Sequence, residues 1–367
     1  MLDYQPCNFW YSREHPILYS VRGFVSRVGL DTSLFFLKYI VSRNLRGADM
    51  SQLLTQIRTS AVLLVTLFGL QLLVVSPALA GASEWIDIRV VDGRLLLETE
   101  IGGVAGYSMI DTGAEVNAIN ATFLSHADLT FDKGRFIEVS GVFSTQRRYT
   151  YKEVPVKIFG TQINFHDLVE LDFDTPDIQM LLGASFLKGY IFQFDYPNQR
   201  LRLITRDSIN LKKIKNVKSK RDPNGGSPLV RVSLTDKADA WLTMDTGATG
   251  GILIDRDLAS RLEWIDTYAT EQSEVSGVNS RGMMEHFRVP SIVFGPVRIA
   301  DVAVSVPAPG EDLQYFKKYV PLGTRIPVGG NSKGLLGYDV LQHFVVTIDY
   351  KTGYVHIHAG EKLSDES

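Results

Sequence analysis

The sequence predicts an all-β protein built of two β-barrel lobes that are related by a pseudo-two-fold axis and carry a few short helices. Three observations lead to this prediction. The chain contains an internal repeat, its apolar residues mostly alternate with polar ones in short runs, and its helical patterns are short. With 367 residues, of which 45% are hydrophobic and 22% charged, the chain is long enough to bury two cores.

The repeat becomes visible when Asp111 is aligned with Asp245. Each copy then contains, in the same order, an Asp-Thr-Gly motif, a Val-Ser-Gly-Val motif, a Val-Pro run that ends at Phe-Gly, a Leu-Leu-Gly motif and an Asp-Tyr pair. Five landmarks in one order indicate a duplicated domain. We expect an N-terminal lobe at residues 84–206, a C-terminal lobe at 228–360 and a tail at 361–367.

Within each copy, short runs of alternating residues that end at turn-forming residues predict strands. The clearest runs are residues 94–103, 154–160 and 190–204 in the first copy and 228–236, 289–295 and 344–358 in the second. Short helical patterns follow the Asp-Thr-Gly and Leu-Leu-Gly motifs, at residues 120–127, 184–189, 255–264 and 338–344. Short strands at regular spacing with few helices indicate a closed β structure in each lobe.

Two further segments stand out from the repeat. Residues 207–227 are rich in lysine and end in Pro, Asn and Gly, so we interpret them as a basic, solvated linker. The alternative is that these lysines bind an anionic surface. The second copy is longer by about nineteen residues, which we place in an insertion around 308–333. Such an insertion is expected to be a surface loop that sets specificity.

The N-terminal part differs in composition from the lobes. An apolar run at residues 61–75 follows Arg58 and precedes an Ala-x-Ala pattern, which predicts a signal peptide at residues 50–80. We interpret residues 1–49 as an extension or a mis-assigned start. The alternative is an uncleaved membrane anchor at residues 58–80. Either way we expect an exported protein, periplasmic or secreted or else held at the membrane.

The composition excludes several classes of function. A formal net charge of −3 argues against a broad nucleic-acid interface. A single cysteine excludes an internal disulfide framework and a cysteine-based metal cluster. His356 and His358 lie two residues apart on one predicted strand, and no third residue follows at a spacing typical of metal ligands. We therefore expect no metal site and no cofactor.

The two Asp-Thr-Gly motifs carry the predicted chemistry. Asp111 and Asp245 each follow apolar residues of a buried strand, where a lone carboxylate is costly. If the pseudo-two-fold axis brings them face to face, like charges force one pKa upward and the pair holds a single proton. One member can then accept a proton while the other donates one.

The neighbouring residues are expected to support this pair. Gly113 and Gly247 allow a tight turn that offers backbone N–H groups to the carboxylates. Thr112 and Thr246 each have a hydroxyl that can bind the backbone of the opposite lobe.

These motifs resemble those of the pepsin/retropepsin superfamily of aspartic peptidases, and more specifically retropepsin-like domains fused in tandem, as in an exported protein of bacterial type. The resemblance rests on Ile110–Ala114, Met244–Ala248, Leu181–Gly183 and Leu335–Gly337, and it covers both lobes. It implies an aspartic endopeptidase in which a water molecule, activated by the two aspartates, hydrolyses a peptide bond. It also implies that the Leu-Leu-Gly motif packs behind each active-site loop.

The resemblance further implies two flaps over a peptide or protein substrate. The flap candidates are Val139, Ser140, Gly141 and Val142 within residues 139–144, and Val275, Ser276, Gly277 and Val278 within residues 275–280. Because both lobes lie on one chain, we expect a monomer.

Both active-site loops continue with alanine, at Ala114 and Ala248, where pepsin-like enzymes have a hydroxyl residue. Since that hydroxyl would stabilise the charged carboxylate, we predict activity closer to neutral pH than that of pepsin. Two alternatives stay open. The chain is either a catalytically inactive peptide-binding protein of the same fold, or an actin-like phosphotransferase, which would need long helices.

Overall fold

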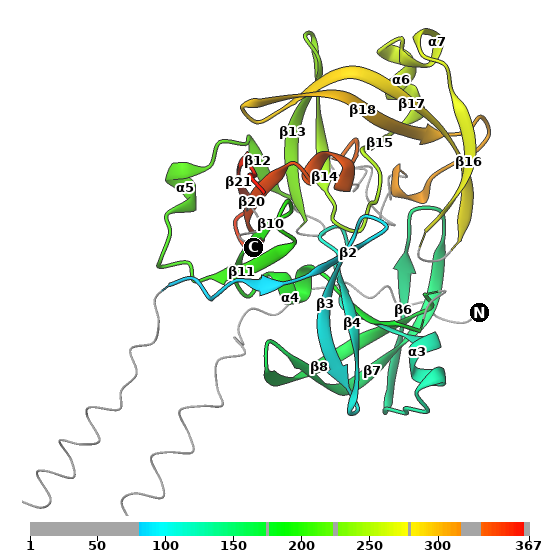
Figure 1. Cartoon of the computed structure of the whole chain (residues 1–367). Helices are drawn as coiled ribbons and strands as arrows, with labels where there is room; N and C mark the ends of the chain where they lie inside the picture. Colours follow the sequence, from blue (N-terminus) through cyan, green and yellow to red (C-terminus); the bar gives the residue numbers. More distant parts are fainter. Residues whose placement is uncertain (1–80, 174–175, 223–226, 278–279, 317–331, 363–367) are drawn as a thin grey trace, which may run out of the picture. The chain divides into compact units, whose positions relative to one another are not determined.

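The computed structural model describes residues 81–173, 176–222, 227–277, 280–316 and 332–362. These residues form mainly β-strands with a few short helices, and the predicted fold class is confirmed (Figure 1). The segments predicted as an extension (1–49) and as a signal peptide or anchor (50–80) lie outside the described residues. Within the described ranges, every helix is too short to cross a bilayer as an apolar span.

The N-terminal lobe is an eight-stranded sheet in the order β2-β3-β4-β9-β5-β8-β7-β6, and a further pairing of β3 with β7 closes a six-stranded barrel. Its strands are β2 (Arg89–Val91), β3 (Arg94–Ile101), β4 (Val104–Ile110), β5 (Ala118–Asn120), β6 (Lys133–Ser140), β7 (Thr145–Ile158), β8 (Thr161–Leu171) and β9 (Ile178–Leu182). Its helices are α3 (Ala121–His126) and α4 (Ala184–Leu187). Alternate residues such as Leu95 and Leu97 point into the barrel and are buried.

The C-terminal lobe repeats this arrangement, with the order β12-β13-β14-β19-β15-β18-β17-β16 and a closing pairing of β13 with β17. Its strands are β12 (Ser219–Arg221), β13 (Pro228–Thr235), β14 (Ala238–Met244), β15 (Ile252–Ile254), β16 (Glu271–Ser276), β17 (Arg281–Phe294), β18 (Val297–Pro307) and β19 (Gly334–Leu336). Its helices are α6 (Arg256–Arg261), α7 (Trp264–Thr267), α8 (Tyr338–Leu341) and the 3₁₀ turn η1 (Gln314–Phe316). The repeat in the sequence therefore corresponds to two copies of one strand order.

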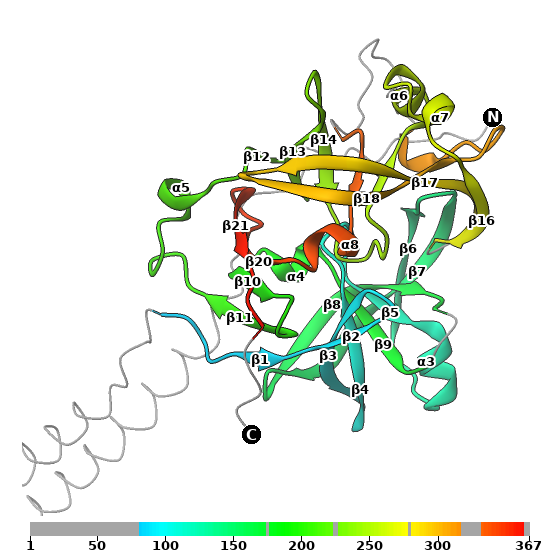
Figure 2. The same ribbon diagram turned by 45° about the horizontal axis from the view of Figure 1, so that its top comes forward.

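A third sheet joins the two lobes. It has the order β1-β11-β10-β20-β21 and consists of β1 (Ile86–Asp87), β10 (Ile191–Asp195), β11 (Arg200–Ile204), β20 (Phe344–Asp349) and β21 (Tyr354–Ala359), which lie together in both views (Figures 1 and 2). The equivalent strands β10 and β20 pair antiparallel, and Gln193 Nε2 donates to Thr347 Oγ1 at 2.7 Å. The two copies thus share this sheet, because the strand β10 of the first copy finds a partner strand, β20, in the second.

Two buried carboxylates hold the hairpin turns of this shared sheet. Asp195 accepts hydrogen bonds from Asn198 and Arg200, and Asp349 accepts them from Arg206 and Thr352. Each carboxylate ends a strand and binds the turn that follows, which is a structural role.

The segment at residues 207–227 is more ordered than a solvated linker. It contains α5 (Leu211–Ile214) and β12, which pairs with β13. The side chains of Leu211 and Val217 are buried, and Asn216 donates to the Ile357 carbonyl of the shared sheet at 2.7 Å. Leu211 and Val217 therefore anchor the segment to the fold, while the side chains of Lys212, Lys213, Lys215 and Lys218 are exposed.

Candidate active site

The two aspartates are placed by equivalent strand pairs. Asp111 directly follows β4, which pairs in parallel with β9, and Asp245 follows β14, which pairs in parallel with β19. The backbone N–H of Asp111 donates to the Leu182 carbonyl at 3.0 Å, and that of Asp245 donates to the Leu336 carbonyl at 2.9 Å. The Leu-Leu-Gly motifs thus lie directly beside the active-site loops.

The glycines that end these motifs are required by close backbone contact. A Cβ at Gly183 would collide with the carbonyl oxygen of Val116, and a Cβ at Gly337 would collide with that of Gly250. Since real Cβ atoms do not approach backbone oxygens so closely, only glycine fits at either position.

The structure brings Asp111 and Asp245 together across the pseudo-two-fold axis. A Cβ at Gly113 would lie 2.5 Å from Asp245 Cγ, and one at Gly247 would lie 2.6 Å from Asp111 Oδ2. Each glycine of the two loops therefore faces the carboxyl group of the opposite lobe. Both aspartates are 9% exposed, and each carboxyl group shifts the pKa of the other.

The two threonines lock the loops to each other. Thr112 Oγ1 donates to the Met244 carbonyl at 2.7 Å and accepts from the Thr246 N–H at 2.8 Å. Thr246 Oγ1 donates to the Ile110 carbonyl at 2.6 Å and accepts from the Thr112 N–H at 3.0 Å. These four reciprocal hydrogen bonds cross between the lobes and fix the separation of the two aspartates.

The hydrogen bonds to the two carboxyl groups are not symmetric. Asp111 Oδ1 accepts from the backbone N–H groups of Gly113 and Ala114, at 2.8 and 2.9 Å. Asp245 Oδ1 accepts from the Gly247 N–H at 2.8 Å, whereas the Ala248 N–H is directed to the Asp245 backbone carbonyl. Because N–H donors stabilise a charged carboxylate, Asp111 is the better anion of the pair.

Burial dominates the electrostatic environment of both carboxyl groups. Burial raises the pKa of Asp111, and the Ala114 and Gly113 N–H groups act against that rise. Burial, followed by the charge of Asp111, raises the pKa of Asp245 well above its usual value, although the Gly247 and Gly113 N–H groups act against that rise. The pair is therefore expected to hold a single proton, and its apparent pKa values belong to the dyad and not to either residue.

The flap candidates are the tips of two long hairpins, β6–β7 and β16–β17, which approach each other in Figures 1 and 2. The Gly141 N–H donates to the Ser144 carbonyl, and the Gly277 N–H donates to the Ser280 carbonyl, so that each turn closes in the same way. Val278 lies outside the described residues.

The two hairpin tips touch. Ser280 Oγ donates to Ser144 Oγ at 3.0 Å, and the ring of Phe143 lies against the backbone of Gly277 and Gly282. On the N-terminal side, Ile137 and Val139 of β6 pack in the same apolar cluster as Ala114 and Val116, which follow Asp111. The N-terminal hairpin therefore shares an apolar surface with the active-site loop.

Sequence reasoning missed two buried tyrosines near the aspartates. Tyr196 and Tyr350 occupy equivalent positions of the repeat and are 4% and 0% exposed. Burial raises the pKa of each, and the charge of Asp245 raises it further. The Asp-Tyr pair present in both copies was the signal that could have identified them, since the shared sheet carries both to the pseudo-two-fold axis.

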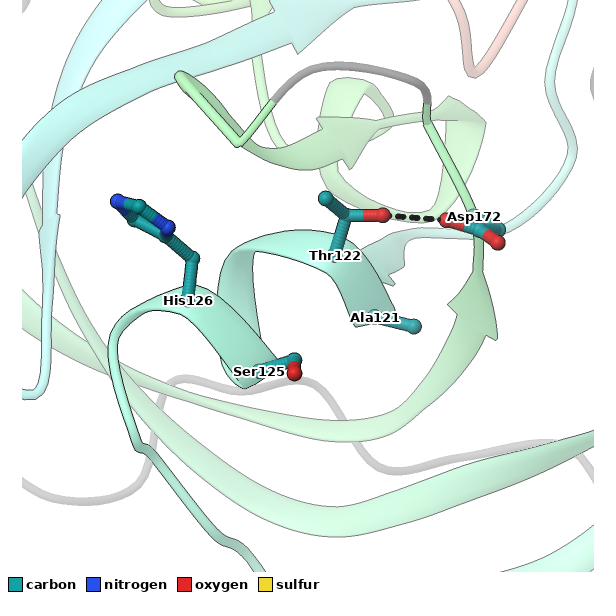
Figure 3. Close-up of a pocket in the computed structure, with 5 residues that line it drawn as sticks. All are labelled: Ala121, Thr122, Ser125, His126 and Asp172. Carbon is teal, nitrogen blue, oxygen red and sulfur yellow. Dashed lines mark hydrogen bonds between the residues drawn. The ribbon is translucent and has the colours of Figure 1, made fainter.

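A separate surface pocket lies on α3 and the end of β8. It is lined by Ala121, Thr122, Ser125, His126 and Asp172, and Thr122 Oγ1 donates to Asp172 Oδ1 at 2.5 Å (Figure 3). Neither aspartate of the pair lines it, and its carboxylate is already bound by its neighbour.

Comparison with protein-family models matches the chain to the model described as aspartyl protease, in two segments, residues 97–186 and 230–340. The two segments together cover more than half of the chain, and each contains one Asp-Thr-Gly and one Leu-Leu-Gly motif. The chain belongs to the aspartyl protease family. A search of curated proteins returned no match.

Membership in the aspartyl protease family confirms the resemblance to tandem retropepsin-like domains and supports a function of the protease type. It also agrees with the fold, because each matched segment falls within one barrel. The described helices reach at most six residues, which does not fit the long helices of an actin-like phosphotransferase.

Proposed function

We propose that the protein is an aspartic endopeptidase in which Asp111 and Asp245 form the catalytic dyad. The observation that carries the proposal is the pair of buried carboxyl groups, each of which faces the active-site loop of the other lobe and is held there by the reciprocal threonine bonds. Burial and the charge of Asp111 raise the pKa of Asp245 well above its usual value, so the pair holds one proton at the pH where an enzyme works.

The unequal hydrogen bonding assigns a starting role to each aspartate. Asp111, as the better anion, takes a proton from the attacking water, while Asp245 gives its proton to the carbonyl oxygen of the scissile amide. The new C–O bond gives a tetrahedral gem-diol. Asp111 then gives its proton to the amide nitrogen while a gem-diol hydroxyl returns a proton to Asp245, and the C–N bond breaks to release an acid and an amine. One proton is again shared by the dyad at the end, so the cycle is balanced.

The substrate class we propose is an extended peptide beneath the two hairpins. Hairpin tips can pair with a peptide backbone as an added strand, and alternate side chains of the peptide then face either lobe. On the N-terminal side the wall is apolar, with Val116, Ile137 and Val139 partly buried in one cluster. This favours an apolar substrate side chain at that position.

The experiment is incubation with a random peptide library, in which the wild type is compared with the Asp111→Asn variant. The matched control is Asp339→Asn, which changes a carboxylate outside the dyad in the same way. We expect cleavage by the wild type and by the control, and none by Asp111→Asn. If the wild type cleaves nothing from about pH 3 to pH 8 but binds peptides as well as Asp111→Asn does, the chain is a peptide-binding protein of this fold.

The state and location of the protein follow as proposals from the sequence. Because one chain supplies both aspartates, we propose a monomer, and light scattering on the purified protein would test this. We also propose export by the segment at residues 50–80. N-terminal sequencing of the protein from its host would locate any cleavage after residue 80.

A further inference from the structure

The two lobes differ just ahead of their catalytic loops. Thr243 lies two residues before Asp245, and the equivalent residue of the first copy is Met109. Met109 packs in the apolar cluster with Ala118 and Leu181, whereas Thr243 places a hydroxyl group at a site that is 5% exposed. A buried hydroxyl needs a hydrogen-bond partner, so the second lobe must supply a polar group that the first does not need.

The insertion of the second lobe supplies that group. Tyr315 lies in η1, within the part of the chain that has no counterpart in the first lobe, and its hydroxyl lies 2.7 Å from Thr243 Oγ1. Tyr315 Oη also donates to Ser332 Oγ at 2.9 Å, and Ser332 Oγ donates to the Gly334 carbonyl at 2.6 Å. In the direction Thr243 to Tyr315 to Ser332 to Gly334, the Thr243 hydroxyl donates, and the hydroxyls of Tyr315 and Ser332 each accept one hydrogen bond and donate one.

The tyrosine is neutral in this setting and therefore able to donate. Burial raises the pKa of Tyr315 to about 12, with a smaller contribution from the charge of Asp245. The hydroxyl network attaches η1 to β14 and β19, the two strands that place Asp245. The described end of the insertion is thus fastened directly behind one half of the dyad.

The same residue reaches the other lobe through its backbone. The Tyr315 N–H donates to the Val142 carbonyl at 3.2 Å, and Val142 lies at the tip of the N-terminal hairpin. That tip is also held by the Ser144–Ser280 hydrogen bond and by Phe143 on Gly282. One residue therefore links the tip of one lobe to the strand that carries the aspartate of the other.

We propose that Tyr315 is a positioning residue that sets the closed position of the N-terminal hairpin tip relative to Asp245. The expected effect on KM rests on the proposed peptidase function, whereas the expected effect on the mobility of the hairpin tip does not. The first copy has no equivalent residue, so among the described residues this link runs only from the C-terminal lobe to the N-terminal hairpin tip. Loosening the hydroxyl network frees the tip and weakens the hold on the substrate, while the dyad keeps its geometry through the threonine bonds.

The test uses Tyr315→Phe, which removes the hydroxyl and keeps the ring. Its matched control is Tyr190→Phe, which makes the same change at a side chain that is 47% exposed. Hydrogen exchange of the hairpin segment 139–146 is measured on the full chain without substrate. We expect exchange there to be about fivefold faster in Tyr315→Phe and unchanged in the control, since loss of one hydrogen bond shifts a local opening equilibrium by about that factor.

With a cleaved peptide, we expect Tyr315→Phe to raise KM about fivefold and to leave kcat within about twofold of the wild type. Ser332→Ala removes the acceptor of the Tyr315 hydroxyl without changing the tyrosine, so it should shift exchange and KM in the same direction. This second variant keeps the test decisive if Tyr315→Phe folds poorly.

The two proposals fail in different ways. Unchanged exchange at residues 139–146 in both variants overturns the role of Tyr315, even if the enzyme is active. A fall in kcat without a change in KM also overturns it, because that result places Tyr315 in support of the dyad and not of the hairpin. Absence of cleavage by the wild type overturns the peptidase function and leaves the exchange result standing.

Discussion

Replacing Thr112 by valine should separate the two active-site loops without changing the shape of the buried side chain. Thr112 is fully buried, and its hydroxyl makes two hydrogen bonds to the other lobe, one to the Met244 carbonyl and one from the Thr246 N–H. Valine fills the same space but leaves both backbone groups without this partner.

The expected cost follows from those two groups. A buried polar group that loses its partner costs about 1–3 kcal/mol, so the loss of a partner by two groups should lower the free energy of unfolding by about 2–6 kcal/mol. This is a large part of the ~5–15 kcal/mol that stabilises an ordinary domain. Urea denaturation followed by tryptophan fluorescence measures the loss as a lower transition midpoint.

Thr112→Ser is the matched control, since it keeps the hydroxyl and removes only a methyl group, at a cost of about 1 kcal/mol. The same pair of changes at Thr246 should give the same order, because the bonds are reciprocal. Combining Thr112→Val with Thr246→Val should cost less than the sum of the single variants, since both act on one network. If valine and serine at residue 112 gave equal stability, the threonine bonds would not hold the lobes together.

Four other outcomes follow from the structure. Asp245→Asn should be more stable than the wild type at neutral pH. The folded wild type holds this carboxyl group with a raised pKa, so its stability falls as pH rises from about 4 to that pKa, whereas asparagine does not titrate. Thermal melts should show the difference in stability between the two proteins shrinking toward about pH 4. Gly282→Ala places a methyl group against Phe143 and should lower stability by about 1–3 kcal/mol, a loss that denaturation should find relieved in a Phe143→Ala background. Arg206→Ala leaves the buried Asp349 with fewer partners and should lower the free energy of unfolding by about 2–3 kcal/mol, a figure already reduced for the partial exposure of the arginine. An unchanged midpoint of urea denaturation would refute this. Because burial raises both dyad pKa values, kcat/KM should peak closer to neutral pH than that of pepsin, and a profile that peaks only near about pH 2–3 would contradict this.

Much of the fold could be predicted because the repeat and the strand periodicity are local properties of the sequence. The shared sheet could not be predicted, because the runs 190–204 and 344–358 show which residues are apolar and not which strand lies beside them. Their pairing depends on the approach of β10 and β20 at the pseudo-two-fold axis. The anchoring of residues 207–227 could not be predicted for a related reason, since many lysines surround the few side chains, such as Val217, that enter the core.

The pair Asp111 and Asp245 could be predicted because a lone carboxylate after a buried strand is costly and both aspartates occupy the same position of the repeat. The difference between them could not, because it depends on whether the Ala114 and Ala248 N–H groups point to a side chain or to the backbone. The role proposed for Tyr315 was equally hidden. An insertion without a counterpart has no repeat to guide its interpretation, and its contact with Val142 spans the two lobes.

The most direct test of the central claim compares turnover in Asp111→Asn, Asp245→Asn and the double variant, with peptide affinity measured for each. If the two carboxyl groups act as one dyad, each single change should lower kcat by about a thousandfold or more, the double variant should be no worse than about the poorer single one, and peptide affinity should persist. A single variant that keeps kcat within about tenfold of the wild type would contradict the claim, because one carboxyl group would then suffice.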